Sequence, residues 1–258
     1  MSLANLPLRS QLHVDRLPLR LLTLAAGLTG YGVGLAMIIR STWGADPWDV
    51  LHVALAERSG LSVGTVIIAT SVLVLLAWIP LRQHVGLGTL ANALWIGVAA
   101  DAGLRLIPEA ATPAGGLGLL IGGIVLNAVS DAVYIGAQLG PGPRDGLMTG
   151  IHHRWGLPIG PVRLALEAVV LAAGWLLGGP VGLGTVLYAA SIGPIVHLVL
   201  PRVTIAVRVL PAPRGRTSPA RSAASDPAPA PGDAAASAPP GPAPAGPASA
   251  PPRPPGAP

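Results

Sequence analysis

The chain has 258 residues, of which 51% are apolar and 10% charged, with a net charge of +5 and a mean hydropathy of +0.62. Soluble domains carry about 25% charged residues, so this composition excludes an ordinary soluble protein and predicts a polytopic membrane protein. All sixteen cations are arginine and cysteine is absent, which excludes disulfides, thiolate metal sites and cysteine nucleophiles.

Apolar stretches in chain order predict an all-α fold with six membrane helices, since about 20 apolar residues cross a bilayer core. The first stretch, 21–39, is longer than the roughly 7–15-residue core of a signal peptide, so we expect it to be retained after a cytoplasmic segment, 1–17. Residues 206–258 become rich in Pro, Ala, Gly and Ser, which predicts a disordered cytoplasmic tail. The expected spans are 18–40, 62–81, 87–107, 115–138, 159–177 and 183–201.

The membrane part of the sequence consists of two similar copies, which align at an offset of 96 residues without gaps. Val85–Thr89 and Val181–Thr185 both read VGLGT, and the pair Ile-Gly at 96–97 returns at 192–193. A period this long excludes a solenoid built from repeats of about 20–50 residues. We therefore expect two membrane units, 18–110 and 111–205.

Three membrane helices in each unit make the second unit enter the bilayer from the opposite side. The duplication thus predicts an inverted-topology repeat, a plan found in many secondary transporters. Positive charge favours cytoplasmic segments. With a cytoplasmic N-terminus, the outside segments hold only Arg40, Arg58 and Arg105, so we expect both termini in the cytoplasm and the protein in the bacterial plasma membrane.

A repeated motif, Pro-x-Asp-x-Leu-x6-Arg-x-Gly-Leu, follows the first membrane helix of each unit. Proline suits the first turn of a helix and glycine its end, so each motif predicts a short capped helix of about twelve residues, or ~18 Å. Such a helix either dips into the membrane as a re-entrant half-helix or lies at the interface as an amphipathic connector. The structural members of the motif are Pro47, Arg58, Gly60, Pro143, Arg154 and Gly156.

Ionisable residues inside a membrane are costly and usually face a cavity or a partner, which makes them candidates for a substrate or ion site. Asp49 and Asp145 fall in the first turns of the two short helices, near unpaired N–H groups and the positive end of the dipole. Asp131 is an isolated acid on the fourth span, one turn before Tyr134, and is the better candidate for a proton or cation site.

Arg163 and Glu167 lie four residues apart on one face of the fifth span, either in the site or as a structural ion pair. The second unit carries added charges, since Arg144 replaces Trp48, so the site is expected to lean toward that unit. Asn92 and Asn127 are expected to hydrogen-bond between helices. The candidate substrate or ion site comprises Asp49, Arg144, Asp145, Asp131, Arg163 and Glu167.

Several other chemistries lack a supporting pattern. No Ser-His-Asp order or carboxylate pair indicates an enzyme, and the glycine pairs lack the strand and lysine of a phosphate loop. His152 and His153 point to different helix faces without a third ligand nearby, so neither a metal nor a cofactor is expected. No basic stripe with stacking aromatics indicates a nucleic-acid partner. The expected partners are the lipid bilayer and a small molecule of unknown identity, and a homo-oligomer is left open.

Several segments are distinctive: Pro-Trp-Asp at 47–49, GLGTLAN at 86–92, the Arg163-x-x-x-Glu167 pair with GWLLGG at 174–179, and most specifically GPGPRDGLMTG at 140–150. Together they resemble the YczE/YyaS/YitT-type family of bacterial integral membrane proteins. The resemblance covers residues 18–205. It implies a multi-pass bacterial plasma-membrane protein without a settled biochemical activity, linked with permease-like or antibiotic-production roles, and it carries no catalytic residue over to this chain.

Two functions of different classes follow from these patterns. The first is a small secondary transporter or permease-like protein, in which the short helices and Asp131 line a central cavity. The second is a non-transporting scaffold or regulator that acts through cytoplasmic loops and the proline-rich tail. The inverted duplication favours transport. Deleting residues 211–258 separates the two, because a transporter should tolerate the loss.

Overall fold

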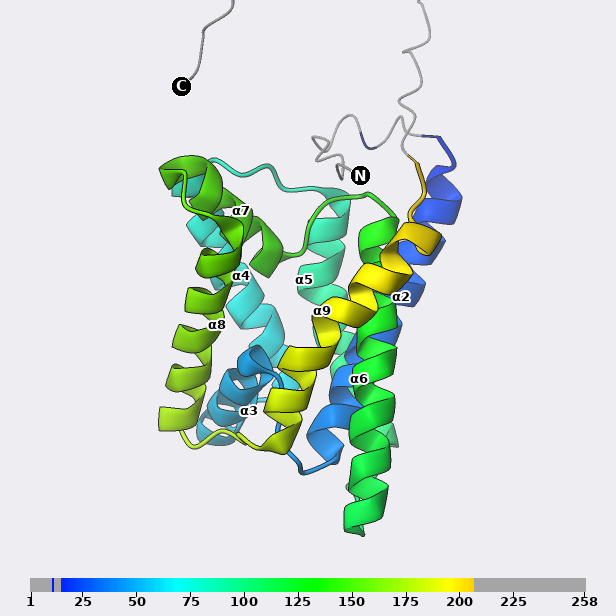
Figure 1. Cartoon of the computed structure of the whole chain (residues 1–258), viewed down its shortest axis with the longest axis vertical. Helices are drawn as coiled ribbons and strands as arrows, with labels where there is room; N and C mark the ends of the chain where they lie inside the picture. Colours follow the sequence, from blue (N-terminus) through cyan, green and yellow to red (C-terminus); the bar gives the residue numbers. More distant parts are fainter. Residues whose placement is uncertain (1–10, 12–14, 207–258) are drawn as a thin grey trace, which may run out of the picture. The chain divides into compact units, whose positions relative to one another are not determined.

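A computed structural model of the chain describes residue 11 and residues 15–206. These residues hold eight α-helices and no strand (Figure 1). The helices are α2 (Leu17–Arg40), α3 (Pro47–Ser59), α4 (Val63–Leu81), α5 (Leu87–Leu106), α6 (Pro113–Gly136), α7 (Pro143–Trp155), α8 (Ile159–Leu176) and α9 (Leu183–Val203). The predicted cytoplasmic tail, 206–258, lies outside the described residues apart from its first position, as does most of segment 1–17.

The six long helices are each apolar enough to cross a membrane, which confirms the predicted number of spans. Their ends agree with the prediction to within two residues. The fourth span, α6, begins earlier than expected because the Thr112 hydroxyl accepts the Gly115 N–H and Pro113 occupies the first turn. It also ends earlier, since Gln138 adopts a left-handed φ of 59° just beyond it.

The order of helices repeats with the offset found in the sequence. Both ends of α6 lie 96 residues after those of α2, and both ends of α7 lie 96 residues after those of α3. The short helices have 13 residues each, which corresponds to about 20 Å and is too little to cross a ~30 Å bilayer core. Gly60 and Gly156 end them in the left-handed conformation, with φ of 72° and 69°.

The helices pack as two groups of four, which are joined by an extensive contact between α4 and α5, where the Ser62 hydroxyl and the Gly64 N–H donate to Asp101. In the first group α2 lies against α5 and α6, and α6 lies against α9. In the second group α3 packs on α8 and α7 packs on α4, with further contacts between α3 and α4 and between α7 and α8. Each short helix therefore lies against the span that follows the other short helix. In Figure 1, α3 lies toward one end of the spans and α7 toward the opposite end.

Glycine permits the closest approach within the first group, between α2 and α6. A Cβ added at Gly27 would lie 2.6 Å from the Tyr134 nitrogen, and one at Gly34 would lie 2.8 Å from the Asn127 nitrogen. Small residues at such contacts let membrane helices pack backbone to backbone, where van der Waals contact replaces the hydrophobic effect as the driving force.

The second group is held by a close glycine contact at each of two equivalent positions. Trp78 of α4 covers Gly146 of α7, and its indole N–H donates to the Pro143 carbonyl at 3.0 Å. At the positions 96 residues away, Gly174 of α8 lies against the backbone of α3, since a Cβ added there would lie 2.6 Å from the Leu51 nitrogen. Trp78 is only 1% exposed, so one short helix is fixed by a buried indole and the other by a close backbone approach.

We predict that Gly146→Ala destabilises the protein by about 1–3 kcal/mol, the usual cost of overpacking. The new Cβ would lie 1.9 Å from a ring carbon of Trp78, a rigid and buried neighbour. Gly193→Ala on α9 is the matched control, because a Cβ there meets nothing within 4 Å. The melting temperature of the detergent-solubilised proteins checks this. Equal melting temperatures for both variants would contradict the Trp78 contact.

Candidate functional site

Two backbone contacts fix where the short helices begin. The Gly184 N–H at the start of α9 donates to the Trp43 carbonyl at 2.7 Å, just before α3. The equivalent Gly88 N–H at the start of α5 donates to the Leu139 carbonyl at 2.8 Å, just before α7. Gly44 has a φ of +105°, and a Cβ there would lie 2.6 Å from a neighbouring backbone nitrogen. Each unit therefore positions the short helix of the other.

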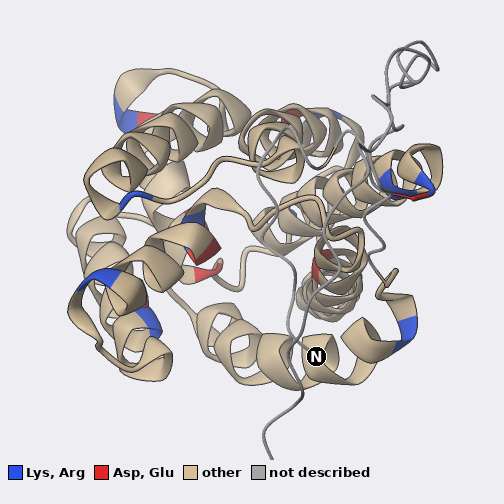
Figure 2. Ribbon diagram, turned by 90° about the horizontal axis from the view of Figure 1, so that it is seen from above, with Lys and Arg blue, Asp and Glu red and all other residues tan. Residues whose placement is uncertain are grey.

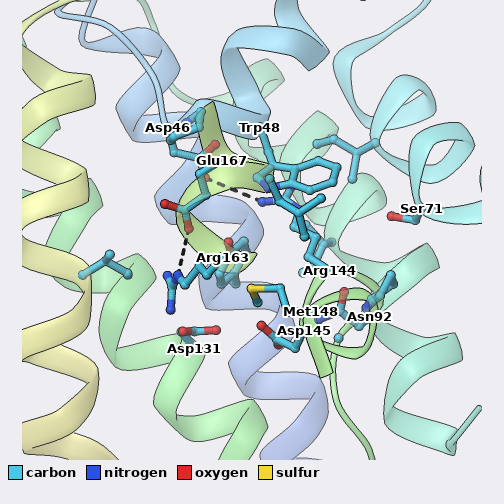
Figure 3. Close-up of a pocket in the computed structure, with 18 of the residues that line it drawn as sticks. Asp46, Trp48, Ser71, Asn92, Asp131, Arg144, Asp145, Met148, Arg163 and Glu167 are labelled. Carbon is cyan, nitrogen blue, oxygen red and sulfur yellow. Dashed lines mark hydrogen bonds and ion pairs between the residues drawn. The ribbon is translucent and has the colours of Figure 1, made fainter. Parts of the chain in front are cut away.

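A cavity of about 100 Å³ lies between the two helix groups, where both short helices begin (Figure 3). Both groups line it: α2, α5, α6 and α9 from one side, and α3, α4, α7 and α8 from the other. Figure 2 shows acidic and basic positions inside the ring of helices, where membrane proteins otherwise bury apolar side chains. The charged lining residues are Asp46, Asp131, Arg144, Asp145, Arg163 and Glu167.

Arg144 of the second unit forms ion pairs with two carboxylates of the first unit. Its guanidinium nitrogens lie 3.8 Å from Asp46 and 4.0 Å from Asp49, and its central carbon lies 4.7 Å from the centroid of the Trp48 ring. These are ion-pair and cation–π distances. Asp49 lies behind this layer, 2% exposed, with its carboxylate 3.0 Å from His52 Nδ1.

The predicted role of Asp49 therefore changes in the structure. Its carboxylate was expected to meet the free N–H groups of α3, but the Asp46 carboxylate accepts the Asp49 N–H at 2.6 Å instead. The side chain of Asp49 is thereby left for His52, whose other ring nitrogen lies 2.9 Å from the Thr70 hydroxyl. Asp49 supports the cavity from behind and does not line it.

Asp131 was expected to be an isolated acid, and the structure shows that this is wrong. It shares the cavity with Asp145 and the Arg163–Glu167 pair, whose nearest atoms are 2.8 Å apart. The side chains meet because α6, α7 and α8 converge, a juxtaposition that spacing along the sequence does not reveal. The Tyr134 hydroxyl donates to Asp145 at 3.3 Å, which joins the two helix groups at the cavity.

The two asparagines differ from each other. Asn127 hydrogen-bonds between helices as predicted, because its amide donates to the Tyr31 carbonyl and accepts from the Tyr188 hydroxyl. Asn92 is 8% exposed and lines the cavity, but its side chain has no hydrogen-bond partner among the residues that the structure describes. The prediction was therefore wrong for Asn92.

The other predicted residues lie outside the cavity, apart from Pro143 and Pro47 in its wall. Arg58 donates to the Leu177 carbonyl at 3.0 Å and ties α3 to the end of α8, while Arg154 is exposed. Sequence reasoning missed Asp46 as a lining residue, because an acid directly before Pro47 suits a helix N-cap and gives no sign of a cavity. It also missed Trp48 and the tyrosines of the lining. Within the described part of the chain, no three His, Asp or Glu side chains are grouped as metal ligands.

Comparison with known proteins identifies the family to which the chain belongs. A model of a family of unknown function, DUF6198, matches residues 18–201. The chain belongs to this family. It is 42% identical over 173 residues to an uncharacterized protein of Haemophilus influenzae, covering 66% of this chain and 78% of that protein.

Two Bacillus subtilis relatives support the resemblance seen in the sequence. The uncharacterized membrane protein YczE is 35% identical over 179 residues, with 69% of this chain and 83% of YczE covered. The uncharacterized protein YyaS is 28% identical over 180 residues, with 68% and 89% covered. No solved structure matches. The YczE and YyaS resemblance is thus confirmed, the similarity to YitT stays a prediction, and the chain is a membrane protein of this kind.

We predict that Arg144→Gln lowers the free energy of unfolding by up to about 3 kcal/mol, because it leaves two buried carboxylates without their cation. Arg154→Gln on the same helix is the control, since Arg154 is exposed and forms no ion pair within the described residues. Chemical denaturation in detergent micelles measures both variants. A loss at Arg154 as large as that at Arg144 would show that the Arg144 ion pairs add no stability.

Proposed function

We propose that this protein is a small secondary transporter. One observation carries the proposal: a charged cavity lies at the interface of two four-helix groups, where the ends of two half-length helices meet. Transporters built from paired repeats place their substrates at such broken-helix sites and expose them by moving one bundle against the other. The proposal assigns the protein no catalytic step.

The two units are proposed to be inverted with respect to each other. Each unit holds three spans, and an odd number reverses the direction in which the next unit enters the membrane. The placement of α3 and α7 toward opposite ends of the spans supports this (Figure 1). On this proposal the capped motif helices are re-entrant and equivalent, one opening toward each side.

The proposed orientation places both termini in the cytoplasm of a bacterial cell, with the spans in the plasma membrane. Arg20 at the start of α2 donates to the Ala137 carbonyl after α6 and to the Ile205 carbonyl after α9. The start of the first span and the end of the last therefore lie at the same end, which agrees with termini on one side. The arginine distribution selects the cytoplasmic side.

Alternating access follows from the contacts across the cavity. Few polar interactions join the two groups there, the Tyr134–Asp145 hydrogen bond among them. The charge cluster of Arg144 with Asp46 and Asp49 lies within the second group. We propose that the second group rotates about the α4–α5 contact, where Ser62 and Gly64 donate to Asp101, with its charges kept paired, while the first stays fixed by its α2–α6 glycine contacts.

The natural absence of cysteine allows a direct test of access to the cavity. We predict that Ser71→Cys, an isosteric change in the lining, reacts with a membrane-impermeant trimethylammonium thiosulfonate added to either side of the membrane. Leu73→Cys on the same helix is the control, because Leu73 is 65% exposed on the outer surface of the bundle and should face lipid. Reaction of Ser71→Cys from one side only would contradict alternating access and favour a scaffold.

A second pair of variants tests the inverted repeat. Leu61 and Leu157 are equivalent exposed residues just after α3 and α7. We predict that Leu61→Cys reacts with an impermeant maleimide in intact cells, and that Leu157→Cys reacts only after the membrane is opened. Because both replace a leucine in equivalent loops, each is the other's control. Labelling of both from the same side would contradict the inversion.

A further inference from the structure

We infer that the cavity binds a small organic cation bearing an ammonium or guanidinium group, at Asp131 and Asp145 with Asn92 as a third partner, and exchanges it for protons. This inference rests on the proposed transport function and adds the class of substrate. Three features of the cavity support it: the carboxylates outnumber the cations, the Asn92 amide has no hydrogen-bond partner among the described residues, and both arginines already have carboxylate partners.

The cavity holds more carboxylates than cations. Asp46, Asp131, Asp145 and Glu167 line it with only two guanidinium groups, and Asp49 adds a further carboxylate directly behind. Buried charges in membrane proteins are compensated by partners, since an uncompensated charge is strongly unfavourable in a medium of low dielectric constant. Protons or an added cation must therefore supply the missing positive charge. An anion would increase the imbalance.

Both arginines already have carboxylate partners, so Asp131 and Asp145 remain without a cation in the described part of the chain. Arg144 pairs with Asp46 and Asp49, and Arg163 pairs with Glu167. Neither Asp131 nor Asp145 has a cationic group within 4 Å among the described residues, and both face the same space below Arg163 (Figure 3). A cation placed there would meet two carboxylates.

Asn92 indicates that the missing group is a hydrogen-bonding ligand. The residue is 8% exposed and lines the cavity without a protein hydrogen-bond partner among the described residues, so its amide is left for a ligand or a water in the cavity. The Asn92 amide nitrogen lies beside the Asp145 carboxylate, because both come within 3.3 Å of a Cβ position built on Gly142. The amide therefore borders the space in which a cation would meet that carboxylate.

The volume of the cavity limits which cation binds, and its excess of carboxylates couples binding to the release of protons. A cavity of about 100 Å³ admits a compact cation or a few waters, and a bulky lipophilic ion does not fit. Protons on Asp131 and Asp145 leave when the cation binds, and they return when it departs. Either occupant compensates the buried carboxylates, whereas an empty deprotonated cavity is costly, so the exchange is coupled.

The experiment uses the full chain in phospholipid vesicles loaded with acidic buffer and the pH dye pyranine. We expect external guanidinium chloride, a permanently charged probe, to drive proton exit that saturates. Sodium chloride and sodium methanesulfonate should not do so. Asp131→Asn and Asp145→Asn should each reduce the initial rate at least about tenfold, and Asn92→Ala should raise the half-saturating concentration about fivefold. Glu109→Gln, an exposed loop carboxylate outside the cavity, is the matched control and should keep the rate.

A second measurement does not depend on the folding of the aspartate variants. In the Ser71→Cys protein, guanidinium should slow the reaction with the thiosulfonate and sodium should not. Proton exit driven by guanidinium and lost in both aspartate variants, together with this protection, would support the inference. Exchange driven equally by sodium, or by methanesulfonate, would overturn the substrate class. No proton exit and no protection, in a protein whose Ser71→Cys still reacts from both sides, would overturn the cation site while leaving the transport function standing.

Discussion

The structure depends on a reciprocal backbone contact between the two halves of the chain. The carbonyl that precedes each short helix accepts an N–H from the first turn of the last span of the other half, Trp43 from Gly184 and Leu139 from Gly88. Only glycine fits at these crossings, because a Cβ at Gly182 would lie 2.4 Å from the Trp43 carbonyl oxygen. These contacts place the start of α3 and the start of α7 at one point inside the bundle, and the cavity is the space that remains there.

The packing around this point is equivalent in the two halves, whereas the charges are not. A glycine lies at each of two equivalent contacts, Gly146 under Trp78 and Gly174 against the α3 backbone, so the two short helices rest on the same framework. At the cavity, the position of Trp48 in one half is taken by Arg144 in the other, and these two side chains stack on each other. The two copies thus share similar short helices, and they differ in their charges, since Arg144, Arg163 and Glu167 stand where the first copy has Trp48, Ile67 and Ser71.

Much of the fold follows from the sequence, because membrane spans are set by local properties. Apolar length gave the six spans to within two residues, and Pro47, Pro143, Gly60 and Gly156 marked both short helices. The α3–α8 and α4–α7 pairings were not predictable, since they depend on contacts about a hundred residues apart. For the same reason the six charged candidates were found one by one, and the grouping of five of them in one cavity was not.

Local competition for hydrogen bonds explains the remaining differences. Asp46 and Asp49 both suit the first turn of α3, and only the structure shows that Asp46 takes the backbone N–H and leaves the Asp49 carboxylate to His52. Asn92 and Asn127 are alike in sequence, but Asn127 meets the Tyr188 hydroxyl and the Tyr31 carbonyl, while Asn92 lines the cavity.

Motion of one helix group against the other is the central claim, and pulsed electron resonance between spin labels measures it most directly. One pair joins Leu61, after α3, to Ala111, before α6, and a second pair joins Leu157, after α7, to Arg202 at the end of α9. In lipid nanodiscs, each pair should show two distances, and acidification should lengthen one pair while it shortens the other. A single unchanging distance for both pairs at every pH would contradict the account.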